Sequence, residues 1–115
     1  YTAVALANEN RRLAAPASLD GGITSGLQED FLAHPTAAAN KLLAIIDNAE
    51  YILAVELMAA AQAHDFVAVN GARATGTGAI HAMVRGVAGH YHDDRPLHGD
   101  IEALRTLIST HQPAE

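Results

Sequence analysis

The most regular pattern of apolar and polar residues runs from Pro35 to Asp65, and no Gly or further Pro interrupts it. Apolar residues advance by threes and fours, as on one face of a helix: Leu42, Ile46, Ala49, Leu53, Leu57 and Ala60. A second set widens this stripe almost to a full cylinder: Leu43, Ile45, Ile52, Val55, Met58 and Ala59. The pattern predicts one long helix that needs partners on most sides, in a helical bundle or an oligomer.

Three shorter segments also have helical patterns. Tyr1 to Leu13 predicts a helix, and Pro16 ends it because proline clashes with the preceding turn of a continuing helix. A short amphipathic helix is predicted from Ala79 to Val87. Asp100 can cap a last helix, whose predicted buried face consists of Ile101, Leu104, Leu107 and Ile108. No segment alternates as a strand does, so the sequence predicts an all-α fold, an elongated helical bundle segment with one long central helix.

The predicted connections differ in length and polarity. Ala14 to Ala33 contains Pro and several Gly, and about twenty residues of irregular chain in a compact domain often have a function. Val67 to Gly78 is predicted to be a glycine-containing loop, and His90 to Gly99 a polar loop. Gln112 onward is predicted to be a frayed tail.

Composition narrows the class of protein. A chain of 115 residues fits one domain, and 50% hydrophobic content excludes a disordered tail. The net charge is −6, and the seven Lys and Arg residues do not cluster, which argues against nucleic acid as a partner. No cysteine is present, and no run resembles a membrane span or a signal peptide. These features predict a soluble, cytoplasmic protein; the chain starts with what looks like the middle of a helix, which indicates a piece of something longer.

Several residues invite a chemical interpretation and also have a simpler one. His90, His92, Asp93 and Asp94 are ordinary metal ligands, but their spacing matches no known metal motif, so we predict a solvated loop and no metal. Gly76-Thr77-Gly78 lacks the remaining residues of a phosphate or dinucleotide loop, which favours a turn. Glu56 lies in an apolar helix and is predicted to form a buried structural salt bridge. His64, near the end of that helix, is favoured there by the helix dipole when protonated.

The segment before the long helix carries the strongest polar cluster, Gln28-Glu29-Asp30. A carboxylate held beside a buried helix can act as a general acid or base, and a neighbouring amide can orient a substrate. By residue type alone, a polar cluster at a helix entry explains the same three residues.

Blocks of residues along nearly the whole chain resemble the histidine ammonia-lyase family in order and spacing. The first blocks are Tyr1-Thr2-Ala3, Ala5-Leu6, Glu9-Asn10, Leu13-Ala14, Pro16-Ala17-Ser18, Asp20, Thr24-Ser25 and Gln28-Glu29-Asp30. The later ones are Leu53-Ala54-Val55-Glu56-Leu57, Ala59-Ala60-Ala61-Gln62-Ala63, Asp94-Arg95-Pro96-Leu97 and Asp100-Ile101-Glu102. The chain looks like the C-terminal helical portion of such an enzyme, a single and incomplete domain over residues 1–115.

The resemblance implies a function. Enzymes of this family eliminate ammonia from histidine, phenylalanine or tyrosine, and related aminomutases shift the amino group. Their electrophile, a methylidene-imidazolone, forms from an internal Ala-Ser-Gly, which these 115 residues lack. The family is all-helical and homotetrameric, with active sites shared between subunits around a central bundle. The N-terminal portion of the same enzyme is therefore an expected partner, and an amino acid the expected substrate.

The resemblance also assigns roles to two residues. Glu29 matches the glutamate that lines the substrate pocket of histidine lyases, where phenylalanine and tyrosine lyases usually have an amide, and this favours histidine. A carboxylate there can hold an ammonium or imidazole group and help to move a proton. Gln28 matches the preceding glutamine. Ser25-Gly26-Leu27 and Phe31 to Pro35 depart from the family's Ser-Ala-Asn and His-Val-Ser-Met-Gly.

Three alternatives follow from these departures and from the loop histidines. The first is an aminomutase of the same family. The second is a non-catalytic helical assembly module derived from it. The third is an independent metal-binding helical protein that uses His90, His92 and Asp94.

Overall fold

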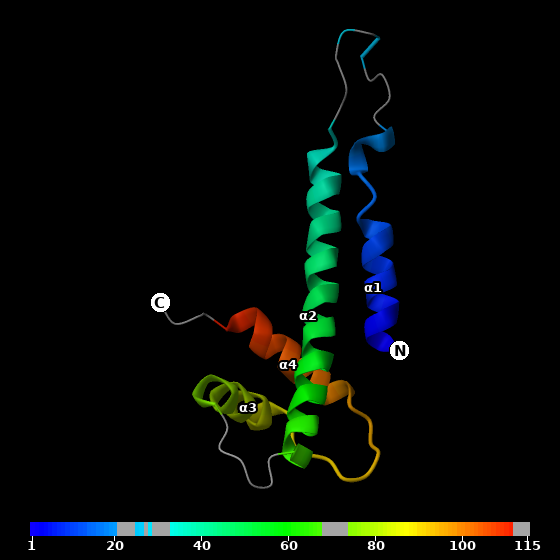
Figure 1. Cartoon of the computed structure of the whole chain (residues 1–115). Coiled ribbons are helices and arrows are strands. Elements are labelled where there is room, and N and C mark those ends of the chain that lie inside the picture. Colours follow the sequence, from blue (N-terminus) through cyan, green and yellow to red (C-terminus); the bar gives the residue numbers. More distant parts are fainter. Residues whose placement is uncertain (21–24, 27, 29–32, 68–73, 112–115) are drawn as a thin grey trace. The chain divides into compact units, whose positions relative to one another are not determined.

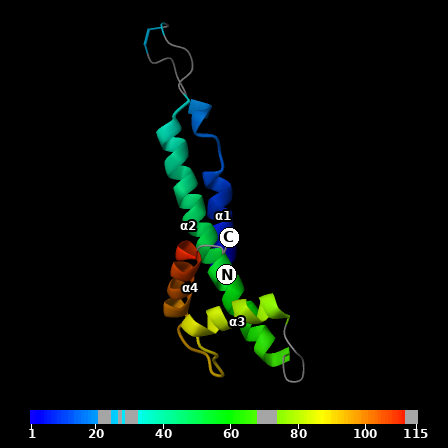
Figure 2. The same cartoon turned by 90° about the vertical axis from the view of Figure 1, so that its left-hand side faces the viewer.

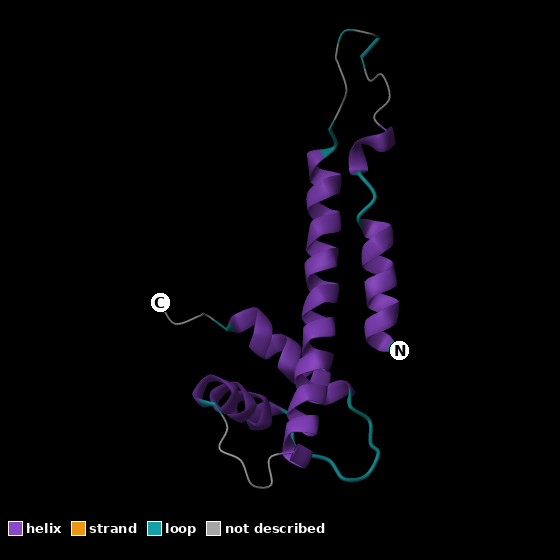
Figure 3. Cartoon of the chain, viewed as in Figure 1, coloured by secondary structure: helices purple, strands orange, loops and turns teal. Residues whose placement is uncertain are grey.

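The computed structural model describes residues 1–20, 25, 26, 28, 33–67 and 74–111. Every regular element in these ranges is helical, as Figure 3 shows, which confirms the predicted all-α class. The elements are α1 (Thr2–Leu13), the short 3₁₀ helix η1 (Ala17–Asp20), α2 (Pro35–Val67), α3 (Thr75–Val87) and α4 (His98–Thr110). Of the helices described, none is both long and apolar enough to cross a membrane.

The long helix is the central element of the chain. It begins at Pro35 as predicted and ends at Val67, two residues beyond the predicted end. Contacts divide the chain into two compact units, residues 1–49 and 50–115, and α2 contributes its first half to one unit and its second half to the other.

In the first unit, α1 runs antiparallel to the first half of α2 (Figure 1). Amide side chains join the two helices. Asn48 Nδ2 donates a hydrogen bond to Asn10 Oδ1 at 2.9 Å, and Asn10 Nδ2 donates to the carbonyl of Ile45 at 3.4 Å. The Lys41 ammonium donates to the carbonyl of Ala15, just after the end of α1. These contacts hold the end of α1 against α2 and so fix where the irregular segment after it begins.

In the second unit, α3 and α4 pack on the second half of α2 (Figure 2). The buried apolar core consists of Ala54, Met58, Ala61, Val84, Ala88 and Leu104. Further side chains are partly buried against it: Leu57, Leu97, Ile101, Leu107 and Ile108. Half of the buried core residues are alanines, which lets the helix backbones approach closely. The predicted apolar face of the last helix is confirmed, with Leu104 fully buried at its centre.

The start of α3 corrects the sequence interpretation. Residues 75–78 were predicted to belong to a loop, but α3 begins at Thr75, and Gly76-Thr77-Gly78 forms its first turn instead of a separate turn motif. The Gly78 N–H donates to the Ala74 carbonyl at 2.8 Å. Glycine costs about 1 kcal/mol relative to alanine in a helix. Packing of the following apolar residues, with Val84 buried, offsets that cost.

The start of α4 differs in a similar way. The residue before the helix is Leu97, and no side chain caps it, so Asp100 is not the cap that the sequence predicts. Asp100 lies in the first turn, where a negative charge is favourable, and it pairs with Arg95 at 2.5 Å. The helix thus begins at His98, three residues before the start at Ile101 that a cap at Asp100 predicts.

Candidate functional site

The segment that leads into α2 contains both residues to which the resemblance assigns a role. Gln28 is exposed in a bend, and its backbone N–H donates to the Ser25 carbonyl at 2.9 Å. Gly26, between them, has a φ of 56°, which glycine adopts readily. Glu29 and Asp30 lie outside the described residues, so the pocket roles of Gln28 and Glu29 stay predictions.

The densest polar cluster that the structure describes was not predicted. Three basic side chains, from α3 and from the segment after it, contact the carboxylate of Asp65 in the last turns of α2. Together with Gln62, which binds one of them, these residues form what we call the Asp65 cluster: Gln62, Asp65, His81, Arg85 and His90. His81 Nε2 lies 2.6 Å from Asp65 Oδ1. Arg85 Nε donates to Oδ2 at 2.9 Å, and His90 Nδ1 lies 3.0 Å from the same oxygen.

A buried amide extends the Asp65 cluster. Gln62 is only 8% exposed, and its Nε2 donates to the Tyr91 carbonyl at 2.7 Å. Its Oε1 accepts a hydrogen bond from Arg85 Nη2 at 3.1 Å, and Arg85 Nη1 donates to the Ala88 carbonyl at 2.9 Å. One guanidinium therefore binds two side chains of α2 and the backbone that follows α3, which fixes where the segment after α3 starts.

The electrostatics of Asp65 follow from these partners. Partial burial of the carboxylate raises its pKa, but hydrogen bonds from His81, His90 and Arg85, together with the charge of Arg85, outweigh this effect. The net result is a pKa lowered from 3.8 to about 2. Asp65 is therefore ionised at neutral pH and acts as an acceptor that joins the elements, not as a general acid.

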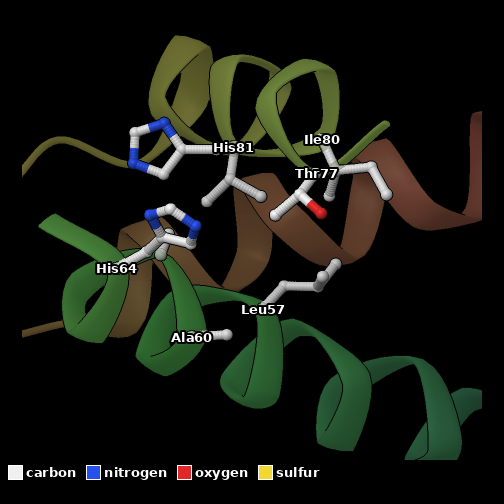
Figure 4. Close-up of a pocket in the computed structure, with 8 residues that line it drawn as sticks. Leu57, Ala60, His64, Thr77, Ile80 and His81 are labelled. Carbon is white, nitrogen blue, oxygen red and sulfur yellow. The ribbon is translucent and has the colours of Figure 1, made fainter. Parts of the chain in front are cut away.

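A small cavity lies between α2 and α3, next to the Asp65 cluster. It has a volume of about 130 Å³ and is lined by Leu57, Ala60, Ala61, His64, Thr77, Ile80, His81 and Val84. Figure 4 shows the rings of His64 and His81 side by side at one end, with centroids 5.6 Å apart. Its walls are otherwise almost entirely apolar, so it accommodates an apolar side chain better than a charged ligand.

A second hollow lies where α3 and α4 meet on α2, and we call it the α3–α4 groove. It has a volume of about 270 Å³ and is lined by Leu57, Ile80, Met83, Val84, Leu107, Ile108 and His111. Three of these residues also line the cavity between α2 and α3: Leu57, Ile80 and Val84. The two hollows therefore share an apolar wall within the second unit.

The structure also places the residues of two other interpretations made from residue types. Glu56 is exposed in this chain, so the predicted buried salt bridge is wrong; an exposed carboxylate on α2 needs no partner. No group of three or more potential ligands among the described residues is arranged to hold a metal ion, and this includes His90, His92 and Asp94. His90 instead faces Asp65, and its ring lies 4.5 Å from that of His92.

One signal in the sequence points to the Asp65 cluster. His81 and Arg85 are four residues apart and therefore lie on one face of α3, and an acid at the end of the preceding helix is a natural partner for that face. The pattern does not say which acid, because the carboxylate lies 16 and 20 residues away along the chain.

Comparisons with known proteins identify relatives across almost the whole chain. A family model described as aromatic amino acid lyase matches residues 1–86. Histidine ammonia-lyase from Natranaerobius thermophilus is 41% identical over 94% of this chain, and the one from Burkholderia ambifaria is 44% identical over 94%. The crystal structure of histidine ammonia-lyase from Trypanosoma cruzi matches 95% of the chain with a TM-score of 0.85 and 32% identity.

The match covers only part of each relative. The chain spans about a fifth of their length: 21% of each of the two bacterial enzymes and 21% of the Trypanosoma cruzi chain. The matched region lies on the C-terminal side of these proteins.

Proposed function

Because the chain belongs to the aromatic amino acid lyase family, we propose that it forms the C-terminal portion of an ammonia-lyase. The reaction is elimination of ammonia from an aromatic amino acid, with histidine favoured, to give the α,β-unsaturated acid. The observation that supports this best is the joint match in sequence and fold: relatives named histidine ammonia-lyase are 41% and 44% identical over nearly the whole chain, and one of known structure superposes with a TM-score of 0.85.

The proposed enzyme needs more than these 115 residues. The chain spans about a fifth of the relatives that it matches, so we propose that residues 1–115 belong to one larger helical domain completed by the N-terminal portion of the same enzyme. The exposed apolar residues of α2 support assembly into a homotetramer: Leu42, Leu43, Ile46 and Leu53 are each at least 46% exposed.

The chain does not supply the electrophile of the reaction. It contains no Ala-Ser-Gly, so the methylidene-imidazolone of the proposed enzyme would come from the N-terminal portion. When present, that group supplies the electrophilic centre that binds the substrate. The part of this chain that we assign to the active site is the segment that ends at Pro35, where α2 begins.

Glu29 is the proposed catalytic residue, and Gln28 and Glu29 the proposed substrate-binding residues. An ionised carboxylate holds the substrate's ammonium or imidazole group by a charge-assisted hydrogen bond and accepts a proton from it. The exposure of Gln28 is compatible with contact to a substrate or to another part of the enzyme. Histidine is favoured because its imidazole offers an N–H to a carboxylate, whereas a phenyl ring offers none.

The test replaces Glu29 in the complete enzyme. Glu29→Ala is expected to lower kcat/KM for histidine by roughly 10²–10⁴-fold, the range for loss of a positioned acid or base. Glu29→Gln keeps the shape and should lose nearly as much, whereas Asp93→Ala, which removes an exposed carboxylate, should change little. Wild-type kinetics in Glu29→Ala for histidine, phenylalanine and tyrosine would refute the assignment.

Product analysis separates the related functions. An α,β-unsaturated acid with free ammonia identifies a lyase, and a β-amino acid identifies an aminomutase. A complete protein that binds none of the three amino acids and releases no ammonia would leave only a structural role for this fold.

A further inference from the structure

His34, the residue directly before α2, has a backbone conformation that residues other than glycine seldom adopt. Its φ is 47°, and no other non-glycine residue among those described has a positive φ. Most side chains are strained there, although histidine adopts such a φ more often than most residues do. The one glycine with a positive φ in the described ranges is Gly26, at 56°. Gln28 therefore lies between the two left-handed residues of the described chain.

His34 also closes the first turn of α2. Its carbonyl accepts a hydrogen bond from the Ala38 N–H at 3.0 Å, as the carbonyl of a helix-capping residue does. A capping residue usually has an extended backbone. Because the φ of His34 is left-handed instead, the chain enters the same first turn from a different direction. The conformation of this one residue therefore sets the side of α2 from which the preceding segment arrives.

Pro35 restricts the ways in which His34 can relax. The proline ring fixes its own φ at about −65°, so Pro35 cannot absorb a change in the direction of the chain. It also disfavours the right-handed helical conformation for the residue before it, which prevents His34 from extending α2 backwards. Ala33, Pro35 and Thr36 are exposed, so packing of these neighbours does not impose the strain.

We propose that His34 is a positioning residue: its left-handed backbone directs the segment that contains Gln28 and Glu29 toward the substrate. Strained backbone conformations cluster at active sites, where they contribute to pre-organisation. The role belongs to the backbone of residue 34 and not to its imidazole. This inference rests on the proposed function, which assigns Gln28 and Glu29 to the substrate pocket.

Substitutions of His34 in the complete enzyme separate the backbone from the side chain. Asparagine tolerates a positive φ and has no imidazole, whereas a β-branched residue is a true outlier there. His34→Asn should keep kcat and KM for histidine close to the wild-type values. His34→Val should lower kcat/KM by roughly 10–10²-fold, as a small misplacement of a positioned group does. Part of this loss should be a higher KM, because a smaller folded fraction of the enzyme lowers kcat alone.

Ala33→Val is the matched control. It introduces the same side chain at the neighbouring exposed position, where φ is not positive, and should leave KM nearly unchanged. An equal loss in Ala33→Val and His34→Val, or a loss in His34→Asn as large as in His34→Val, would refute the role of the backbone. Should His34→Val fail to fold, His34→Ala replaces it, with a smaller loss in the same direction, because alanine also adopts a left-handed φ at a cost.

Thiol labelling reports the position of the segment without catalysis. The chain has no cysteine, so Gln28→Cys places a single thiol in residues 1–115. Its labelling rate in the complete enzyme, measured by mass spectrometry of the peptide, should change severalfold with His34→Val and stay the same with His34→Asn. Arg12→Cys, at an exposed position of α1, should label equally fast in both backgrounds. An unchanged rate at residue 28 in His34→Val would overturn the proposal.

The proposed positioning and the proposed reaction can fail separately. An enzyme that releases ammonia from histidine equally well in His34→Asn and His34→Val refutes the positioning alone. A complete protein without lyase activity, in which His34→Val but not His34→Asn changes the labelling at residue 28, refutes the proposed function and supports the directing role of His34.

Discussion

Asp65 shows how one side chain can join three parts of a fold. Its two carboxylate oxygens accept hydrogen bonds from His81 and Arg85 on α3 and from His90 beyond it. Replacement by asparagine keeps the shape but removes the charge, and one oxygen becomes an N–H donor that faces other donors. A partly buried donor without an acceptor costs free energy, so Asp65→Asn should loosen the packing of α3 on α2.

Asp65 also predicts an acid-dependent part of the stability. Its pKa is lowered to about 2 in the folded chain from 3.8, so between these values the unfolded state binds more protons than the folded state. The contribution of Asp65 to the free energy of unfolding is therefore present above about pH 4 and is lost as the pH falls through about 2. Asp65→Asn should lower the Tm at neutral pH, and the difference from the wild type should shrink toward pH 2.

Thermal unfolding followed by circular dichroism between pH 2 and 7 measures this difference. Asp94→Asn is the matched control, because it neutralises an exposed carboxylate in the loop after α3. A Tm difference for Asp65→Asn that stays constant over this range would contradict the assigned ion pairs.

For single residues, the sequence predicts some roles and misses others, and each miss has a physical reason. The roles of Gln28 and Glu29 follow only from resemblance and stay predictions, since Glu29 lies outside the described residues. The basic partners of Asp65 lie 16 to 25 residues away along the chain, so the local spacing of His81 and Arg85 does not identify the acid that they bind. The prediction for Glu56 is wrong for a different reason: an apolar neighbourhood in the sequence predicts burial, but in the part of the chain that the structure describes no residue buries this side chain.

At the scale of elements, α3 contains a glycine that its structure does not require. Gly86 is the next to last residue of α3, and a Cβ placed there meets no atom within 4 Å. Glycine loses more backbone freedom on folding than alanine does. Gly86→Ala should therefore stabilise the chain by roughly 0.5–1 kcal/mol, measured as a higher midpoint in urea at unchanged slope.

Gly26→Ala is the informative contrast to Gly86→Ala. A Cβ at Gly26 also has space, but the residue has a φ of 56°, which alanine adopts only at a cost. Gly26→Ala should therefore leave the free energy of unfolding unchanged or lower it. A gain of equal size at both positions would show that the difference in backbone conformation has no effect on stability.

The elements themselves were largely predictable because they depend on periodicity. The 3.6-residue pattern of α2 identifies the helix over nearly its whole length, and its end is in error by only two residues. The start of α3 is not predictable in this way, because Gly76 and Gly78 disfavour a helix locally and packing overrides them. The start of α4 is misplaced for a related reason: the capping rule points to Asp100, whereas no side chain caps this helix.

At the scale of the whole molecule, the apolar stripe of α2 is the main unexplained surface. Leu42 is 56% exposed, and Ile46 and Leu53 are each 46% exposed. These residues follow one another along a single helical face, and a contiguous apolar surface on a monomer usually marks an interface. We expect other subunits to cover it in the proposed homotetramer.

Introducing a negative charge on the apolar stripe of α2 tests the proposed assembly. Leu42→Glu and Ile46→Glu, made separately in the complete enzyme, place a carboxylate on the stripe, and burying an unpaired charge is costly enough to favour dissociation. Light scattering after size exclusion should show a mass below that of four subunits, together with reduced activity if active sites are shared. Asn40→Glu, on an exposed polar position of the same helix, should leave the tetramer intact. Misfolding without dissociation would assign the stripe to packing within one subunit, and an unchanged tetramer would mean that the stripe lies outside the interface.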